Sequence, residues 1–243
     1  MSNQLKKLEK ALKKARNKEQ AKILQRFFKT SPGEYGEGDV FLGIKVPEQR
    51  KIAIQFSPYL NSKDIQELLN SEIHEHRLVG LLILIKKYEQ ASIALNEKTK
   101  QKIFDFYLEN ALRINNWDLV DLSAPNIVGN FLLDKNLERE ILYNLANSKH
   151  LWERRIAIVS CFEFIRNNQF SDALHIVKTF LKNSEQHDLI HKASGWMLRE
   201  IGKRDLKILE KFLKQYNKKM PRTMLRYAIE KFDEKKRKSY LYP

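Results

Sequence analysis

The sequence predicts an all-α protein in which pairs of helices stack into an α-solenoid with a concave basic groove. Apolar residues recur at helical spacing along most of the chain, no comparable set of alternating strand positions occurs, and a helical motif repeats at a fixed interval. The 243 residues are 42% hydrophobic and 31% charged with only 8 Gly and 6 Pro, which excludes collagen-like, low-complexity and disordered classes. We expect one domain over residues 1–243, ending in a flexible tail over about residues 231–243.

Helices and one long loop are predicted from local patterns. Residues 1–18 are charged throughout and lack the apolar stretch of a secretory signal. Gly and Pro crowd residues 32–47, which predicts a loop between helices. Four helices are predicted from apolar residues spaced three and four positions apart: Leu78, Leu81, Leu82 and Ile85; Phe104, Tyr107, Leu108 and Ala111; Ile158, Cys161, Phe162 and Ile165; Ala173, Ile176, Val177 and Phe180. No apolar run reaches the roughly 18 residues of a membrane-spanning helix, so we expect an intracellular protein, cytoplasmic and associated with the nucleoid.

A repeat underlies the helices. The tripeptide EHR at residues 75–77 and the tripeptide ERR at residues 153–155 each precede an apolar helical run, at an offset of 78 residues. This offset is about two units of a helix-pair repeat near 40 residues. Trp117 lies near the midpoint, and Lys192 lies about one further unit on. Such pairs bury their apolar faces by stacking into a solenoid, and the alternative is an irregular helical bundle whose spacing coincides with a repeat.

The charge balance predicts a polyanionic partner. Lys and Arg number 45 against 30 Asp and Glu, which gives a formal net charge of +15 and a pI near 9.7. An ordinary solvated basic surface is the alternative. Membrane-surface binding fits less well, because the basic residues are spread along the whole chain and are not confined to one amphipathic segment.

Common catalytic and metal-binding patterns are absent. The segment GEYGEG at residues 33–38 follows no predicted strand and has no lysine and hydroxyl pair close behind it, so it is not a phosphate-binding loop. Cys161 is the single cysteine, agrees with a reducing compartment and is expected in the core. Two histidine pairs lack further ligands at suitable spacing: His74 with His76, and His187 with His191. We therefore expect neither a metal nor a cofactor.

The segment NNWDLVD at residues 115–121 combines a large aromatic residue with a carboxylate. Asn116 is a suitable N-cap and Asp118 suits the first turn, so a helix is predicted to start here. That helix places Trp117 and Asp121 four positions apart on one face. The alternative is that Trp117 belongs to the core and Asp121 is an ordinary surface carboxylate.

A second segment, GWMLRE at residues 195–200, places Trp196 and Arg199 on one helix face. Gly195 inside a helix costs about 1 kcal/mol relative to Ala, which suggests close approach by another backbone or by a ligand. Trp152, the third tryptophan, precedes the ERR tripeptide. In a solenoid, equivalent helices line one wall, so a single groove can collect these residues: Trp117, Asp121, Arg155, Lys192, Trp196 and Arg199.

These segments resemble the AlkD-type DNA alkylation repair proteins, which are DNA glycosylases built of HEAT-like helical repeats. The resemblance runs from FLGIKVPEQR at residues 41–50, through NNWDLVD and WERRIAI, to KASGWMLREIGK at residues 192–203. It implies that Asp121 is the catalytic carboxylate and that Trp117 and Trp196 contact the damaged nucleotide. It also implies that Arg155 and Arg199 bind backbone phosphates, and it places Lys45 where relatives can carry a glutamine that approaches the DNA near the lesion. We expect Lys192 and Lys45 to contact phosphates as well.

The implied function is excision of alkylated purines from duplex DNA by a monomeric enzyme without metal or cofactor. A purine alkylated at N3 or N7 is cationic, so it leaves readily and is attracted to indole faces by cation–π interaction. Its departure leaves an oxocarbenium-like sugar, and Asp121 can either stabilise that cation or orient the attacking water. The sequence leaves two other functions open: a nucleic-acid-binding protein without catalysis, and a HEAT-type scaffold for protein interactions.

Overall fold

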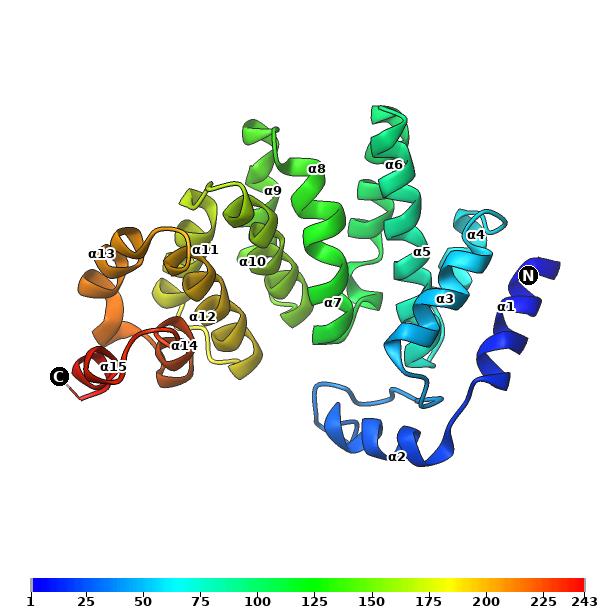
Figure 1. Ribbon diagram of the computed structural model, residues 1–243, viewed down its shortest axis with the longest axis horizontal. Coiled ribbons are helices and arrows are strands. Elements are labelled where there is room, and N and C mark those ends of the chain that lie inside the picture. Colours follow the sequence, from blue (N-terminus) through cyan, green and yellow to red (C-terminus); the bar gives the residue numbers. More distant parts are fainter. Residues whose placement is uncertain (1, 243) are drawn as a thin grey trace. The chain divides into compact units, whose positions relative to one another are not determined.

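The computed structural model describes residues 2–242, and helices account for most of them (Figure 1). Within these residues no strand forms, and a single isolated parallel bridge joins Val40 to Ile73. The all-α prediction is therefore confirmed. The chain divides into two compact units, of which unit 1 ends at Leu119 and unit 2 begins at Val120. No helix of the described part is long and apolar enough to cross a membrane.

Unit 1 is organised around one long buried helix, α5. Its segments are α1 (Asn3–Lys14), α2 (Lys18–Phe27), α3 (Val46–Phe56), α4 (Ser62–Leu69), α5 (His74–Ile93), α6 (Glu97–Glu109) and a 3-10 turn (Ala111–Arg113). Helices α3, α4 and α6 all pack against α5. The run from Leu78 to Ile85 explains this arrangement, because its eight residues are all buried and so fill every side of the helix.

The predicted loop connects α2 to α3 and is fastened to α5 by one carboxylate. Glu75 accepts hydrogen bonds from the backbone N–H groups of Leu42, Gly43 and Ile44 at 2.9, 2.7 and 3.2 Å. Gly43 has a φ of +83°, and a Cβ there would lie 2.1 Å from the carbonyl oxygen of Asn17. Only glycine fits this point, so the loop enters α3 along a fixed path.

Unit 2 contains the remaining helices. Helix α7 (Trp117–Ala124) begins in unit 1 and continues into unit 2. The segments after it are a π-helical turn (Pro125–Gly129), α8 (Asn130–Leu132), a 3-10 turn (Asn136–Arg139), α9 (Glu140–Ala146), α10 (Leu151–Arg166), α11 (Ser171–Lys182), α12 (Asp188–Gly202), α13 (Leu206–Tyr216), a 3-10 turn (Asn217–Lys219), α14 (Arg222–Ala228) and α15 (Glu234–Leu241). Helix α10 packs against α9, α11 and α12, and α12 packs against α13 and α14. Cys161 of α10 is fully buried, as expected, and burial raises the pKa of its thiol.

Gly195 lies where α12 and α14 approach each other closely. A Cβ at this position would lie 2.5 Å from both the carbonyl oxygen of Met224 and the Cβ of Tyr227. The glycine in the middle of α12 is therefore explained by a neighbouring backbone and not by a ligand.

The segment expected to be a tail contains α15. This helix buries none of its residues, and Lys236 forms an ion pair with Glu210 of α13. Pro243, the last residue of the expected tail, lies outside the described residues.

Candidate active site

Helix α7 begins at Trp117, as the sequence predicts. The side-chain oxygen of Asn116 accepts a hydrogen bond from the Trp117 backbone N–H at 2.8 Å, and Asp118 lies in the first turn. Trp117 and Asp121 are four residues apart on this helix, but Trp117 belongs to unit 1 and Asp121 to unit 2.

In unit 1, Trp117 is half-buried among aromatic side chains. Its ring stacks on Phe28, with centroids 5.3 Å apart, and meets the edge of Phe27 at 6.0 Å. Its indole N–H donates to the hydroxyl of Tyr35 in the α2–α3 loop at 3.3 Å. Trp117 is thus neither a fully buried core residue nor a loose surface residue, since its ring is held in place and still partly exposed.

The aromatic stack continues inward from Phe28. Phe41 stacks on Phe28 at 5.1 Å and on the imidazole of His74 at 4.6 Å. Both nitrogens of His74 face carboxylates, with Nδ1 3.1 Å from Asp39 Oδ2 and Nε2 2.8 Å from Asp118 Oδ2. Burial opposes the positive charge of His74, but the hydrogen bonds to Asp118 and Asp39 outweigh it and raise the histidine's pKa to about 9.

Asp39 is the centre of this buried polar cluster. Besides His74, it accepts hydrogen bonds from Arg77 Nη2 at 2.5 Å and from Asn116 Nδ2 at 3.3 Å. Burial acts to raise the pKa of Asp39, but its bonds to His74, Arg77 and Asn116 together lower that pKa. The neighbouring His76 behaves differently, because burial and the charge of Arg77 lower its pKa to about 4.

In unit 2, Asp121 forms an ion pair with the guanidinium of Arg155. Arg155 of α10 donates from Nε to Asp121 Oδ1 at 2.9 Å and from Nη2 to Oδ2 at 2.7 Å, and Nη1 donates to the carbonyl of Leu189 at 2.5 Å. The Arg155 side chain is 5% exposed, whereas that of Asp121 is 21% exposed. The carboxylate is thus oriented by two hydrogen bonds while part of it faces solvent.

Helix α12 carries three further residues singled out in the sequence. Trp196 is half-buried, and its ring centroid lies 5.3 Å from that of Phe162 on α10. Arg199, one turn further along, forms an ion pair with Glu230, and Lys192 forms one with Asp188 at 2.6 Å. An aromatic face and two cations therefore lie along one helix.

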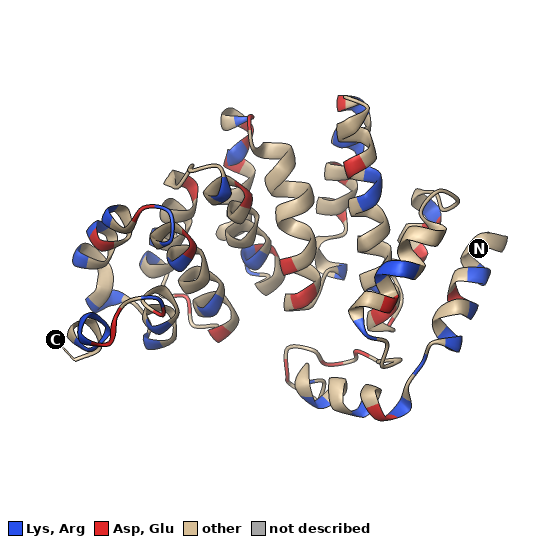
Figure 2. Cartoon of the chain, viewed as in Figure 1, with Lys and Arg blue, Asp and Glu red and all other residues tan. Residues whose placement is uncertain are grey.

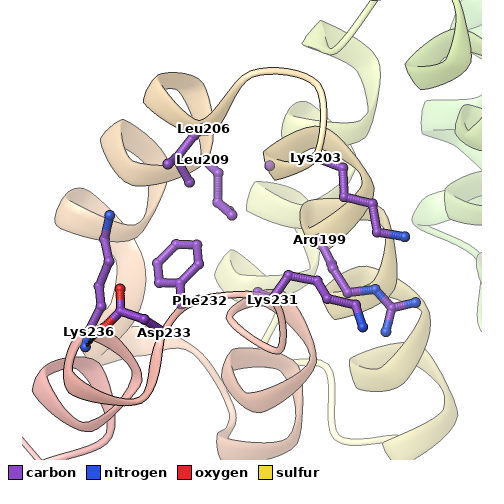
Figure 3. A pocket seen from close by; sticks show the side chains of 10 residues that line it. Arg199, Lys203, Leu206, Leu209, Lys231, Phe232, Asp233 and Lys236 are labelled. Atoms are coloured by element: carbon purple, nitrogen blue, oxygen red, sulfur yellow. Dashed lines mark hydrogen bonds between the residues drawn. The ribbon is translucent and has the colours of Figure 1, made fainter.

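Arg199 also lines a pocket of about 300 Å³ between α12, α13 and the chain after α14 (Figure 3). Leu206, Leu209 and Phe232 form its apolar part, and the ring of Phe232 faces Leu209. The cations around it are engaged with nearby acids: Lys203 with Glu200, Lys231 with Glu230, and Lys236 with Glu210. Their positive charge is therefore largely offset within the protein.

The predicted site residues are distributed over both units. Lys45 is exposed and immediately precedes α3 in unit 1, where Trp117 also lies. Unit 2 holds the other five: Asp121, Arg155, Lys192, Trp196 and Arg199. Lys and Arg as a class occur on helices of both units (Figure 2). Among the described residues, no group of three or more His, Cys, Asp or Glu side chains gathers to hold a metal.

Two buried arginines have partners that their local sequence does not indicate. Arg77 pairs with Asp39 and donates to the carbonyl of Ser71, and Arg155 pairs with Asp121 and donates to the carbonyl of Leu189. The aspartates precede their arginines by 38 and 34 residues, close to the predicted repeat length. The EHR and ERR tripeptides indicated a repeat, but they did not indicate that each of the two arginines forms a buried ion pair.

The chain is similar to known proteins over most of its length. A family model described as DNA alkylation repair enzyme matches residues 8–232. A solved structure described as a predicted DNA alkylation repair enzyme from Enterococcus faecalis shares the fold, with a TM-score of 0.64 and 16% identity over 90% of this chain and 97% of that one. No curated protein matches the sequence.

Proposed function

The chain belongs to the family of DNA alkylation repair enzymes, and on this premise we propose that it is a monofunctional DNA N-glycosylase. It hydrolyses the N-glycosidic bond of purines carrying a cationic alkyl adduct at N3 or N7 in duplex DNA. The protein acts as a monomer in the cytoplasm, on the nucleoid, without metal or cofactor. A single domain over residues 1–243, built as a HEAT-like solenoid with a basic groove, is part of the proposal.

The observation that carries the proposal is that the carboxylate of Asp121 is oriented by an arginine and still partly exposed. Arg155 engages both of its carboxylate oxygens, yet the side chain is 21% exposed. A carboxylate that is oriented before substrate arrives can stabilise a cation without having to reorganise. The sugar from which a purine departs is such a cation, because the carbon that loses the base becomes oxocarbenium-like.

The reaction balances with water as the only co-substrate. The bond between the purine nitrogen and the sugar C1′ breaks with its electron pair moving to the base, which neutralises the positive charge of the alkylated ring. Water adds its oxygen to C1′ and releases a proton, while Asp121 holds the cation and orients the water. A cationic leaving group requires no general acid, so one carboxylate is sufficient.

The remaining predicted residues bind the DNA. Trp117 and Trp196 are half-buried and present indole rings, which attract cationic bases by about 0.5 to 2 kcal/mol per contact. Arg199, Lys192 and Lys45 contact backbone phosphates. A guanidinium has five N–H groups, and three of those of Arg155 donate to Asp121 and Leu189. The proposed phosphate contact of Arg155 uses the other two.

The test is single-turnover release of 3-methyladenine and 7-methylguanine from methylated duplex DNA. Asp121→Asn keeps the size of the side chain and removes its charge, so excision should fall by at least about a hundredfold. Asp172→Asn is the matched control, because Asp172 pairs with Arg139 inside the same unit at 2.9 Å. It should lower stability and keep excision.

Substrate charge gives a second test of the same proposal. Uracil and 8-oxoguanine leave as anions and need a proton donor beside the base, so the protein should not release them. A chelator should leave the rate unchanged. Release of uracil, loss of activity in chelator, or binding of damaged DNA without excision would each contradict the proposed chemistry.

A further inference from the structure

His74 is a buried ionisable side chain of unit 1 that lies between two carboxylates. It is 2% exposed, and both of its ring nitrogens lie within hydrogen-bond distance of carboxylate oxygens, those of Asp39 and Asp118. An ionised carboxylate only accepts hydrogen bonds, so each ring nitrogen must carry a hydrogen. When both carboxylates are ionised, this geometry fits an imidazolium between the two acids.

The acids bridged by His74 belong to different segments of unit 1. Asp39 comes from the α2–α3 loop, and Asp118 comes from the first turn of α7. Arg77, on the same helix as His74, adds a second cation to Asp39 at 2.5 Å. Two buried cations thus meet two carboxylates, so the cluster is balanced in charge and all its members are tied together.

Trp117 is connected to this cluster in three ways. The residue before it, Asn116, donates to Asp39, and the residue after it, Asp118, accepts from His74. Its ring also continues the stack that runs through Phe28 and Phe41 to the imidazole of His74. Both backbone neighbours and the side chain of Trp117 therefore depend on where His74 lies.

We propose that His74 is a positioning residue for Trp117, acting as a buried imidazolium clamp between Asp39 and Asp118 that fixes the first turn of α7 and the orientation of the indole ring. This inference rests on the proposed function, in which Trp117 contacts the damaged nucleotide. His74 itself touches no substrate, and its effect passes through Asp118 and the aromatic stack.

Deprotonation of His74 distinguishes a clamp that depends on the charged imidazolium from simple packing of the ring. A neutral imidazole has one N–H, so it can donate to only one of the two acids. The charged groups that face the ring are Asp39 from the loop, Asp118 from α7 and Arg77 from its own helix, with a resulting pKa of about 9. The orientation of the Trp117 ring should therefore be fixed below this pH and no longer fixed above it.

The first measurement follows the indole N–H signal of Trp117 by NMR, assigned by its disappearance in Trp117→Phe, from pH 6 to pH 10. In the wild type this signal should titrate with a midpoint near 9. His74→Gln should abolish the titration. Asp118→Asn keeps an acceptor but removes one negative charge, so the midpoint should fall by about one pH unit or more.

His76→Gln is the matched control, because it makes the same substitution two residues away on the same helix. His76 Nδ1 lies 3.1 Å from the hydroxyl of Ser71, and among residues 2–242 no carboxylate is hydrogen-bonded to it. The control should keep the titration near pH 9. Single-turnover excision should fall about tenfold in His74→Gln, as for a displaced contact residue, and stay near normal in His76→Gln.

The outcomes separate the two proposals. A Trp117 signal that is independent of pH, or equal effects of the two glutamine variants, would overturn the role of His74. Absence of excision in the wild type would overturn the proposed glycosylase, while the Trp117 titration would still decide about His74. If His74→Gln does not fold, the midpoint shift in Asp118→Asn decides the question.

Discussion

The ion pair between Asp121 and Arg155 should be worth a measurable coupling energy in unit 2. Arg155→Gln removes two hydrogen bonds to Asp121 and one to the Leu189 carbonyl. Removing one partner of a buried pair costs about 3 to 5 kcal/mol. The Asp121 side chain is 21% exposed and regains some hydration, so we expect a loss near the lower end, about 3 kcal/mol.

A double-mutant cycle isolates the pair itself. Asp121→Asn leaves the guanidinium of Arg155, whose side chain is only 5% exposed, without its counter-charge. We expect the variant with both substitutions to be about 2 kcal/mol more stable than the sum of the single losses predicts. As a control, Arg155→Gln combined with Asp172→Asn should be additive within about 0.5 kcal/mol, because Asp172 pairs with Arg139 instead.

The tryptophans allow this cycle to be measured in unit 2 alone. The chain has three tryptophans, of which Trp117 lies in unit 1, while Trp152 and Trp196 lie in unit 2. In a Trp117→Phe background, tryptophan fluorescence during urea unfolding therefore follows unit 2. A coupling energy below about 0.5 kcal/mol would show that Arg155 does not hold Asp121 in solution, and the argument for an oriented carboxylate would fail.

Three other expectations follow from local geometry. Gly195→Ala places a Cβ 2.5 Å from the Met224 carbonyl oxygen and should lower the free energy of unfolding by about 1 to 3 kcal/mol, measured by urea denaturation. Arg199→Ala should weaken binding to all duplexes and reduce the salt-dependence slope by about one unit, whereas an unchanged slope would remove Arg199 from the interface. The pKa of His76 is lowered to about 4, so its contribution to stability is present above pH 6.5 and lost as the pH falls towards 4. As the pH falls from 7 to 4, His76→Gln should therefore lose less of its free energy of unfolding than the wild type loses, each protein being compared with its own value at pH 7.

Local features were predictable because they depend on neighbours in the sequence. The start of α7 at Trp117 was expected from Asn116 as an N-cap candidate and from Asp118 in the first turn, and the burial of Cys161 follows from the apolar face of its helix. Gly195 was unusual enough within a helix to indicate a close approach, which α14 makes. Each of these predictions rests on spacing within a few residues.

Contacts between distant segments were not predictable in the same way. His74 finds its two acids 35 and 44 residues away, and nothing in its local spacing identifies Asp39 or Asp118. The resemblance assigned Arg155 a phosphate contact, whereas its burial and its three internal bonds emerge only when α7, α10 and α12 are assembled. Periodicity identifies the face of a helix that is buried, but it does not identify the residue that the face meets.

The two arginine–aspartate pairs differ in how much of the carboxylate water can reach. Arg77 pairs with Asp39 of the α2–α3 loop and Arg155 pairs with Asp121 of α7, but the Asp39 side chain is 3% exposed and that of Asp121 is 21% exposed. A carboxylate sealed from water can only hold together the segments that its partners come from. A carboxylate that keeps part of its surface in solvent, while a guanidinium fixes its orientation, can also meet a molecule that arrives from outside.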